Sequence, residues 1–587
     1  MSKPQYYDQE TFIQNMALEP VWKKELNGKG ITVLVTDNGI LQHDDVCCNV
    51  DRKKSVNSLY YDKSIYENAN KFSSHGTAIG ALVAGQGKYY YIGCAPQATL
   101  IDLNFDEVSM EQLVEYWLKY IDCVDIYTNS WGFLPVDYKP TELVRSFKVL
   151  TSKGRKGKGS IIVFSAGNND NSELEHSGFK KFLTFDTSVN HLLNSRYTIS
   201  VGATDNNNVK APFSSRGSSL LCCASLTGTY SNTVKSVFSN TGTYVYGTQY
   251  NTVLTASAGS DYGYLPVSNS YTGTSFAAPI ISGICALLLQ YREDLTWRDV
   301  KELISLSCYQ PQVDGVRMNG DKRLISELTG FGILNAQKLI KNAKCWKLLS
   351  KEEVLEITVP LSEDIKRINL QKNPESTTEE NNEKNIVLEK YIPNDFIIET
   401  FQLNLNINAV KDKTVECSLD LFLKFLNGDV SSQFLPEFAT AYALSLIALQ
   451  TSDIRITVIS PSNTKIVMAV GNMFENIQQT VVPIENAYSQ YLIDQDIEKF
   501  RLAMKEFFNI IVPFYATFEA YASTWLNHLI LTELLRGERT KGTWKIMFND
   551  VVLDIIETIS GNTIPTTFLN GVKLIFAGHS DVKCCDK

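Results

Sequence analysis

The sequence predicts an α/β domain with a mainly parallel sheet over residues 1–345, followed by a strand-rich domain over residues 346–587. Short apolar runs alternate with helical patterns in the first part, which is typical of a parallel sheet flanked by helices. From about residue 346 apolar and polar residues alternate, as they do in half-buried strands. A chain of 587 residues is also too long for a single hydrophobic core.

The composition is that of a globular protein and argues against several functional classes. The net charge of −9 argues against nucleic acid as the main partner and weakly favours neutral or basic substrates. We find no run of about 20 apolar residues free of charges, so we expect no transmembrane segment. The 12 cysteines show neither a zinc-binding spacing nor a readable disulfide framework, which leaves the redox compartment open.

The first candidate residue follows the first predicted strand. Residues 31–36 are apolar and β-branched, and they end at Asp37-Asn38-Gly39. We interpret this run as a buried parallel strand whose carboxyl end presents Asp37 at the edge where open α/β sheets place their sites. The alternative is a turn residue that only caps the strand.

A histidine at the start of a predicted helix is the second candidate. The chain contains 6 histidines, and His75 lies in the small-residue segment 73–78, just before an apolar helix over residues 79–84. A lone histidine is more often structural. Here the small neighbours and the helix start favour a neutral imidazole that faces a pocket.

Two further strands are predicted to end at the same edge of the sheet. Residues 126–132 end in Ser130-Trp131-Gly132, and residues 160–168 end in Asn168. The Asn168 amide could donate a hydrogen bond to an oxyanion. A turn residue in the left-handed conformation is an equally good interpretation of Asn168 in isolation.

The segment 271–279, YTGTSFAAP, leads into the apolar run 280–291. We expect Gly273 to let the backbone approach a substrate closely. We expect Ser275 at the start of a long helix, where free N–H groups and the helix dipole favour developing negative charge. The alternative is an ordinary capped core helix.

Asp37, His75 and Ser275 follow the chain order of the subtilisin triad. In that triad the serine attacks a carbonyl carbon, the histidine takes the serine proton, and the aspartate holds the histidine in one tautomer. Asn168 would then stabilise the oxyanion. The agreement of four separate motifs predicts a subtilisin-like serine protease.

Other segments resemble the kexin-like proprotein convertases. They are Ser130-Trp131-Gly132 and residues 154–160, 165–168, 295–299 and 331–336 in the first domain, and residues 459–465 and 542–546 in the second. The last two segments resemble the P domain, the β-sandwich that follows the catalytic domain in this family. The resemblance implies endoproteolysis of precursor proteins after paired basic residues, with calcium support.

The resemblance also places residues in the substrate-binding region, where this sequence departs from the family. The segment 130–132 would line that region, and Asp137 would match the acidic residue at the base of the arginine pocket. Asn190 stands where its acidic companion is expected, and Asn38 replaces a second aspartate that helps to recognise the preceding basic residue. Fewer carboxylates weaken guanidinium recognition. Cleavage after basic residues is therefore predicted, with relaxed, non-dibasic specificity and a non-catalytic binding protein of the same fold as alternatives.

Calcium is the one cofactor that the resemblance implies, and two substitutions weaken this prediction. Arg216 stands where an acidic ligand is expected, and the loop 86–91 carries tyrosines where the family has a calcium-binding asparagine. We therefore assign no metal ligands, and we expect no organic cofactor.

The second domain is predicted to be a β-sandwich with two irregular parts. Strands are expected within residues 354–359, 399–409, 416–425 and 453–459. The polar stretch 372–390 is interpreted as a flexible loop. Residues 484–536 are interpreted as a helical insertion, with helices at 497–511 and 522–535, that packs against the sandwich rather than binding a partner.

The resemblance implies a protein of the secretory pathway, but the first residues show no signal-peptide pattern. Asp37 lies about as far from residue 1 as in a mature convertase. Either the sequence begins after processing, or the protein is an unusual form that lacks the signal and pro-segments. We expect peptide or protein substrates with exposed basic sites as partners, and a pro-segment or inhibitor as a further partner.

Overall fold

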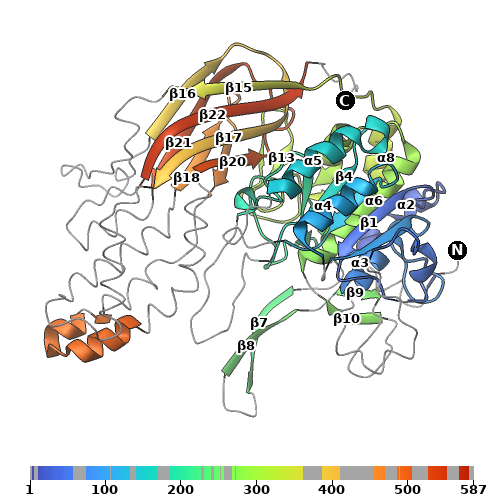
Figure 1. The fold of residues 1–587 in the computed structure, drawn as a ribbon, viewed down its shortest axis with the longest axis horizontal. Coiled ribbons are helices and arrows are strands. Elements are labelled where there is room, and N and C mark those ends of the chain that lie inside the picture. Colours follow the sequence, from blue (N-terminus) through green and yellow to red (C-terminus); the bar gives the residue numbers. More distant parts are fainter. Residues whose placement is uncertain are drawn as a thin grey trace.

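The computed structural model describes most of the α/β part and the main strands of the second part (Figure 1). The described residues are 3–4, 11–41, 43–56, 75–105, 108–132, 141–168, 186–226, 230–238, 244–250, 253–256, 267–271, 273–360, 386–409, 454–469, 486–487, 489–505, 526–550 and 567–580.

An eight-stranded sheet forms the centre of the α/β part. Its strands are β1 (Thr32–Asp37), β2 (Thr99–Asn104), β3 (Ile126–Asn129), β4 (Ile161–Ser165), β5 (Thr198–Thr204), β6 (Leu220–Ser225), β11 (Cys308–Tyr309) and β14 (Ile333–Leu334). They lie in the order β11-β14-β6-β5-β4-β3-β1-β2. Only the edge pair β11–β14 is antiparallel. The predicted mainly parallel sheet is confirmed.

Helices cover both faces of this sheet (Figure 1). On one face α6 (Ala277–Tyr291) packs against β3, β4 and β5 and against α3 (His75–Ala84). On the other face α4 (Met110–Lys119) and α5 (Thr141–Lys153) build a second cluster around the buried rings of Trp117, Phe147 and Phe164. The described α/β part also contains α1 (Phe12–Asn15), α2 (Glu19–Trp22), α7 (Trp297–Ser307) and α8 (Ala336–Lys344).

Helix α6 is the most deeply buried long element of the described structure. All its residues from Ala277 to Leu289 are buried. In the described part of the chain, one helical stretch, Thr274–Tyr291, is long and apolar enough to cross a membrane, and 83% of it is buried inside the protein. A core helix of a globular domain has this same composition.

Three two-stranded ribbons accompany the central sheet. They are formed by β7 (Tyr230–Phe238) with β8 (Tyr244–Tyr250), β9 (Val253–Ala256) with β10 (Val267–Tyr271), and β12 (Arg317–Met318) with β13 (Leu324–Ile325). All three pairs are antiparallel.

The described strands of the second part form two antiparallel four-stranded sheets. One has the order β15-β22-β17-β20 and the other β16-β21-β18-β19. Their bounds are β15 (Glu353–Val359), β16 (Ile386–Ile392), β17 (Ile397–Ala409), β18 (Ile454–Ile459), β19 (Lys465–Ala469), β20 (Leu526–Thr532), β21 (Gly542–Asp550) and β22 (Thr567–His579). The Trp544 ring of one sheet lies 5.3 Å from Phe401 and 5.0 Å from Phe576 of the other, which makes a sandwich core.

The predicted strands at 354–359, 399–409 and 453–459 correspond to β15, β17 and β18. The predicted strand at 416–425 lies outside the described residues. The change from α/β structure to antiparallel strands falls between α8, which ends at Lys344, and β15, which begins at Glu353.

Two predictions in this part were wrong over some of their length. Residues 386–390, expected in a flexible loop, belong to β16, because this segment pairs with β21 and buries Leu388. Residues 526–532, expected to be helical, form β20. Leucine and isoleucine fit either conformation, and pairing with β17 satisfies the backbone of this segment as a strand.

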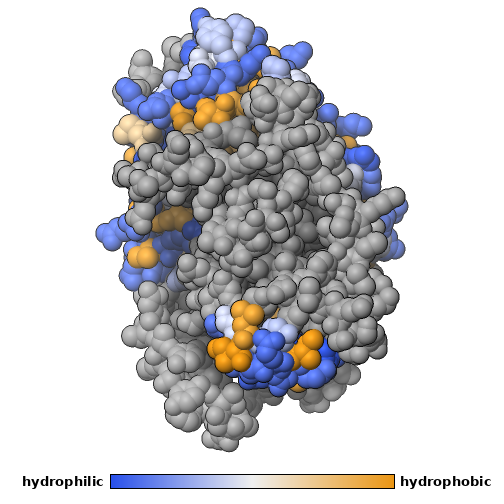
Figure 2. Space-filling model, turned by 90° about the vertical axis from the view of Figure 1, so that its left-hand side faces the viewer, coloured by the Kyte–Doolittle hydropathy of each residue, from blue (hydrophilic) through white to orange (hydrophobic). Residues whose placement is uncertain are grey.

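Helical structure is present at residues 489–494 and 497–505. These residues expose several apolar side chains, among them Leu492, Ile493 and Leu502. Figure 2 shows apolar and hydrophilic side chains next to one another at this end of the molecule.

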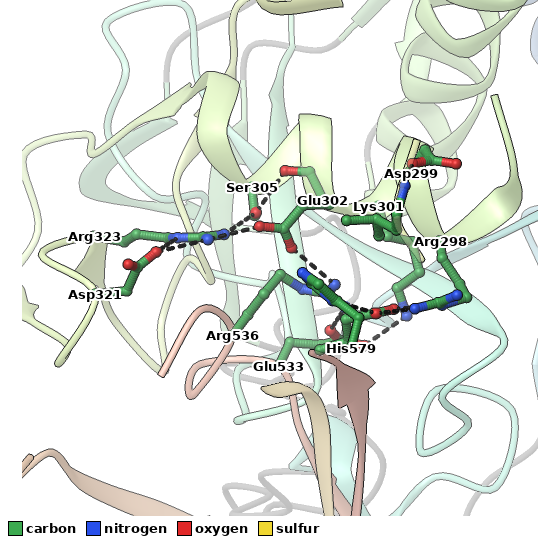
Figure 3. A network of polar contacts seen from close by, with 12 residues as sticks. Arg298, Asp299, Lys301, Glu302, Ser305, Asp321, Arg323, Glu533, Arg536 and His579 are labelled. Carbon is green, nitrogen blue, oxygen red and sulfur yellow. Dashed lines mark hydrogen bonds and ion pairs between the residues drawn. The ribbon is translucent and has the colours of Figure 1, made fainter. Parts of the chain in front are cut away.

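A network of buried ion pairs joins α7 to the second part of the chain (Figure 3). Arg298 Nε lies 2.9 Å from Glu399 Oε2, and Lys301 Nζ lies 2.6 Å from Glu533 Oε1. Arg536 bridges Glu302, at 3.2 Å, and Glu533. Because a buried charge without a partner is strongly destabilising, these pairs tie the two parts together.

Candidate active site

Asp37 and His75 form a hydrogen-bonded pair at the carboxyl edge of the sheet. Asp37 is the last residue of β1, and His75 is the first residue of α3. His75 Nδ1 lies 2.8 Å from Asp37 Oδ1. The Asp37 side chain is almost fully buried, whereas 27% of the His75 side chain is exposed. The Asp37 carboxylate is therefore shielded from solvent, whereas the His75 imidazole is partly accessible.

The segment that follows β1 holds the start of α3 in place. The Gly76 N–H donates to Asn38 Oδ1 at 2.9 Å, and the Leu41 N–H donates to Thr77 Oγ1 at 2.9 Å. A Cβ atom at Gly76 would lie 2.5 Å from the Gly39 carbonyl oxygen. Only glycine therefore permits this close approach of the helix start to the end of β1.

The environment of His75 raises the pKa of its imidazole above the ordinary value of 6.5. Burial opposes protonation, but the hydrogen bond to Asp37 and the negative charge of Asp37 favour it more strongly. The protonated form of His75 is therefore stabilised by Asp37.

Ser275 lies in a short 3₁₀ turn, Thr274–Phe276, that leads directly into α6. Its Oγ donates to the Ser130 carbonyl oxygen at 3.3 Å, and Ser130 Oγ donates back to the Ser275 carbonyl oxygen at 2.6 Å. The Phe276 ring packs edge-on against the His75 ring, with 5.3 Å between the ring centres. These contacts bring the ends of β1 and β3 and the starts of α3 and α6 to one site.

Asn168 is held by Thr274, a residue to which sequence reasoning gave no role. Asn168 Oδ1 accepts hydrogen bonds from the Thr274 N–H at 2.7 Å and from Thr274 Oγ1 at 2.9 Å. Gly273, with φ of +128°, allows a close approach, because a Cβ atom there would lie 2.8 Å from Asn168 Nδ2. With its oxygen fixed on Thr274, the exposed Asn168 amide has Nδ2 left as a donor.

The other residues expected to bind substrate have more varied surroundings. The half-buried Trp131 ring packs against Phe105 at 5.3 Å and Phe164 at 5.5 Å, whereas Gly132 is exposed. The Asn190 side chain accepts a hydrogen bond from the Leu192 N–H at 2.9 Å, which caps a local turn. Asp137 lies outside the described residues. Substrate contacts of these residues, and of Asn38, stay predictions.

The described residues do not fit calcium at the two places to which the resemblance points. At the first place, burial raises the pKa of Asp186 to about 7, against the hydrogen bonds from Ser188 and the positive charge of Arg216, which favour the ionised form. The second place is the loop at 86–91. There the backbone N–H groups of residues 88–91 donate to the carboxylate of Asp45. Over the described ranges, no three His, Cys, Asp or Glu side chains gather into a metal site.

A model of the Subtilase family matches residues 28–332, which is more than half of the chain and includes every residue of the described site. The chain belongs to the Subtilase family. It is 29% identical over 352 residues to proprotein convertase subtilisin/kexin type 6 of Rattus norvegicus, covering 58% of this chain and 34% of that protein. It is 28% identical to kexin of Saccharomyces cerevisiae, covering 56% of this chain and 37% of that protein.

This subtilase therefore matches about a third of the length of these relatives. Among solved structures, the serine protease of Aeromonas sobria has a TM-score of 0.63 at 17% identity, covering 96% of this chain and 91% of that one. The shared fold extends over both the α/β part and the β-sandwich. The predicted subtilisin-like fold and the kexin-like resemblance are confirmed.

Proposed function

We propose that this subtilase is a serine endopeptidase with Asp37, His75 and Ser275 as its catalytic residues. The observation that carries the proposal is the 2.8 Å hydrogen bond between His75 and Asp37, at the site where Ser275 is fixed on Ser130. Asp37 orients the imidazole and stabilises its charged form, which a base in acyl transfer requires.

In this mechanism the Ser275 hydroxyl attacks the scissile carbonyl carbon, and His75 takes the hydroxyl proton. The Asn168 amide donates to the oxygen that becomes negative, and the positive end of the α6 dipole favours the same charge. His75 then returns the proton to the leaving amine, which gives an acyl-enzyme on Ser275. Water attacks the acyl-enzyme by the same steps, with His75 again the base.

We propose precursor proteins with exposed basic residues as substrates. The relatives named proprotein convertase, kexin and dibasic-processing endoprotease support this substrate class. Because Asn190 offers an amide where a carboxylate is expected and uses its oxygen locally, we expect weaker selection for arginine. Relaxed specificity is the second candidate, and it rests on this contact.

We further propose that residues 1–345 form the peptidase domain and residues 346–587 a P-like domain. From the kexin-like resemblance we also propose passage through the secretory pathway.

The proposed activity is tested with a fluorophosphonate probe, which labels activated serines. Wild-type protein should be labelled and the Ser275→Ala variant should not, whereas a Ser282→Ala variant, altered at a buried serine of α6, should retain the label. Absence of labelling in well-folded wild-type protein would contradict the proposal. A mixed peptide library then measures specificity: a strong excess of cleavage after Lys-Arg or Arg-Arg supports the convertase type, and broad cleavage supports the second candidate.

A further inference from the structure

The buried carboxylate of Asp45 is surrounded by backbone N–H groups from four consecutive residues. The N–H groups of Lys88 and Tyr89 donate to Oδ1, both at 2.9 Å. Those of Tyr90 and Tyr91 donate to Oδ2, at 2.7 and 3.1 Å. Asp45 is fully buried, so these hydrogen bonds take the place of hydration for its carboxylate.

The polarity of this arrangement is opposite to that of a cation site. Calcium is held by six to eight oxygen ligands, many of them backbone carbonyls that turn toward the ion. Here the N–H ends of the peptide dipoles turn inward, and each carboxylate oxygen already accepts two hydrogen bonds. Convergent N–H groups attract anions and repel a cation. The Asp45 side chain supplies the matching negative charge from within the chain.

The same segment fixes the end of the helix that begins with His75. The Gln86 N–H donates to the Asp45 carbonyl oxygen at 2.8 Å. Asn49 Nδ2 donates to the carbonyl oxygens of Ala84 and Pro96, at 2.6 and 3.0 Å. Helix α3 ends at Ala84, so residues 45–49 fix its carboxyl end as residues 38–41 fix its start.

We propose that Asp45 replaces a bound cation as the group that organises residues 85–93. The kexin-like resemblance implies calcium at this loop. The geometry instead assigns the loop a metal-independent support, in which one internal carboxylate binds four successive backbone N–H groups. The stability of this loop should then depend on Asp45 and be indifferent to calcium at this position.

The test compares thermal unfolding of three proteins, each with EGTA and with calcium chloride. All carry Ser275→Ala, so self-digestion cannot contribute and the result does not depend on the proposed activity. Asp45→Asn should lower the unfolding midpoint by about 4–10 °C, because the amide cannot accept all four hydrogen bonds. The same loss should appear in EGTA and in calcium. Asp44→Asn is the matched control for removal of one negative charge, and we expect it to lose far less.

A calcium-dependent loss would overturn the proposal. If calcium stabilises the Ser275→Ala parent and this gain disappears in Asp45→Asn, then Asp45 is a calcium ligand. Calcium bound elsewhere would raise the unfolding midpoints of the parent and of Asp45→Asn by the same amount. The difference between the two proteins would then still be independent of calcium, as the proposal expects.

Amide hydrogen exchange of the Ser275→Ala parent keeps the proposal testable if Asp45→Asn does not fold. The N–H groups of residues 88–91 should be protected in EGTA, and added calcium chloride should leave their exchange rates unchanged. Exchange that is fast in EGTA and slows by tenfold or more with calcium would contradict the proposal.

Discussion

Ser130 and Ser275 are joined by two reciprocal hydrogen bonds, each from the hydroxyl of one residue to the backbone carbonyl of the other. The bond from Ser130 Oγ, at 2.6 Å, fixes the backbone of the proposed nucleophile to the end of β3. The bond from Ser275 Oγ is longer, at 3.3 Å, and is therefore the weaker of the two, which suits a hydroxyl that must turn to the proposed base His75.

Ser130→Ala should lower kcat about fivefold to tenfold, because one hydrogen bond that positions the Ser275 backbone is lost. Steady-state kinetics on a peptide substrate measure this change. Ser152→Ala, which removes an exposed serine hydroxyl from α5, is the control and should leave kcat unchanged. A wild-type kcat in Ser130→Ala would show that α6 alone positions the nucleophile.

Asn168→Ala should reduce kcat about 10²–10³-fold, which is the usual effect of losing one oxyanion donor. Thr274→Val keeps the shape of the side chain but removes the hydroxyl that donates to Asn168 Oδ1 and accepts from the Gly167 N–H at 3.0 Å. Both bonds hold the segment around Asn168, so we expect a smaller loss of about threefold to tenfold. In the Asn168→Ala background, Thr274→Val should have almost no further effect. Additive losses in the double variant would mean that Thr274 acts independently of Asn168.

The pH profile of kcat/KM should fall on the acid side with an apparent pKa above 6.5, because His75 must be neutral to act as a base and Asp37 raises its pKa. Asp37→Asn should lower kcat about 10⁴-fold, the loss expected when the histidine is held in the wrong tautomer. The acid limb of this variant should also lie at lower pH. Without the charge of Asp37, burial acts on His75 and lowers the pKa of its imidazole. An acid limb at the same pH in both proteins would exclude Asp37 as the cause of the raised pKa.

Glu399 should make the fold sensitive to acid. Although burial opposes ionisation, hydrogen bonds from His579 and Arg298 and the charge of Arg298 lower the pKa of Glu399 from 4.5 to about 2. A depressed carboxyl pKa contributes stability above the unfolded value. This contribution, about 3 kcal/mol, is lost as the pH falls from about 4.5 toward 2. Urea unfolding of the Ser275→Ala protein at pH 7, 4 and 3 measures the loss.

Glu399→Gln should be less stable at pH 7 by about 3 kcal/mol, because Arg298 loses the closer of its two carboxylate partners in the described structure and keeps only Glu352 at 3.8 Å. It should lose less further stability in acid. Glu389→Gln removes a carboxylate from an exposed ion pair with Lys545 and should change stability by less than about 1 kcal/mol. Equal acid sensitivity of Glu399→Gln and the parent would contradict the role given to this carboxylate.

The parts of this protein that sequence reasoning predicted are those with a local pattern. Asp37, His75, Asn168 and Ser275 lie in short segments whose small residues reflect close backbone approach, as the Gly76 and Gly273 contacts show. The parallel order of the strands brings the ends of those segments together. The contact of Thr274 with Asn168 was not predicted, because the two residues are far apart in the sequence and meet only in the folded chain.

Other features depend on partners that the local sequence does not identify. Residues 526–532 are a strand because β17 lies beside them, although the same apolar residues suit a helix. The partners of Asp45 are backbone N–H groups. Because nearly every residue has such a group, the sequence does not show which segment Asp45 binds. Lys301 has the sequence context of an exposed helical lysine, yet it is buried against Glu533, and burial lowers its pKa to about 8.

The pairing of α7 with distant segments also affects the order of events during synthesis. Lys301 and Glu302 leave the ribosome 232 and 234 residues before the partners Glu533 and Arg536 that they meet in the folded protein. At a translation rate of 5–20 residues per second, this interval lasts roughly 10–50 s. During that time Glu302 can pair only with its nearer partner Arg323, and Lys301 lacks its carboxylate. A nascent chain can therefore pair β1 with β3 before these partners of α7 have been synthesised, and the sandwich can dock on α7 only afterwards.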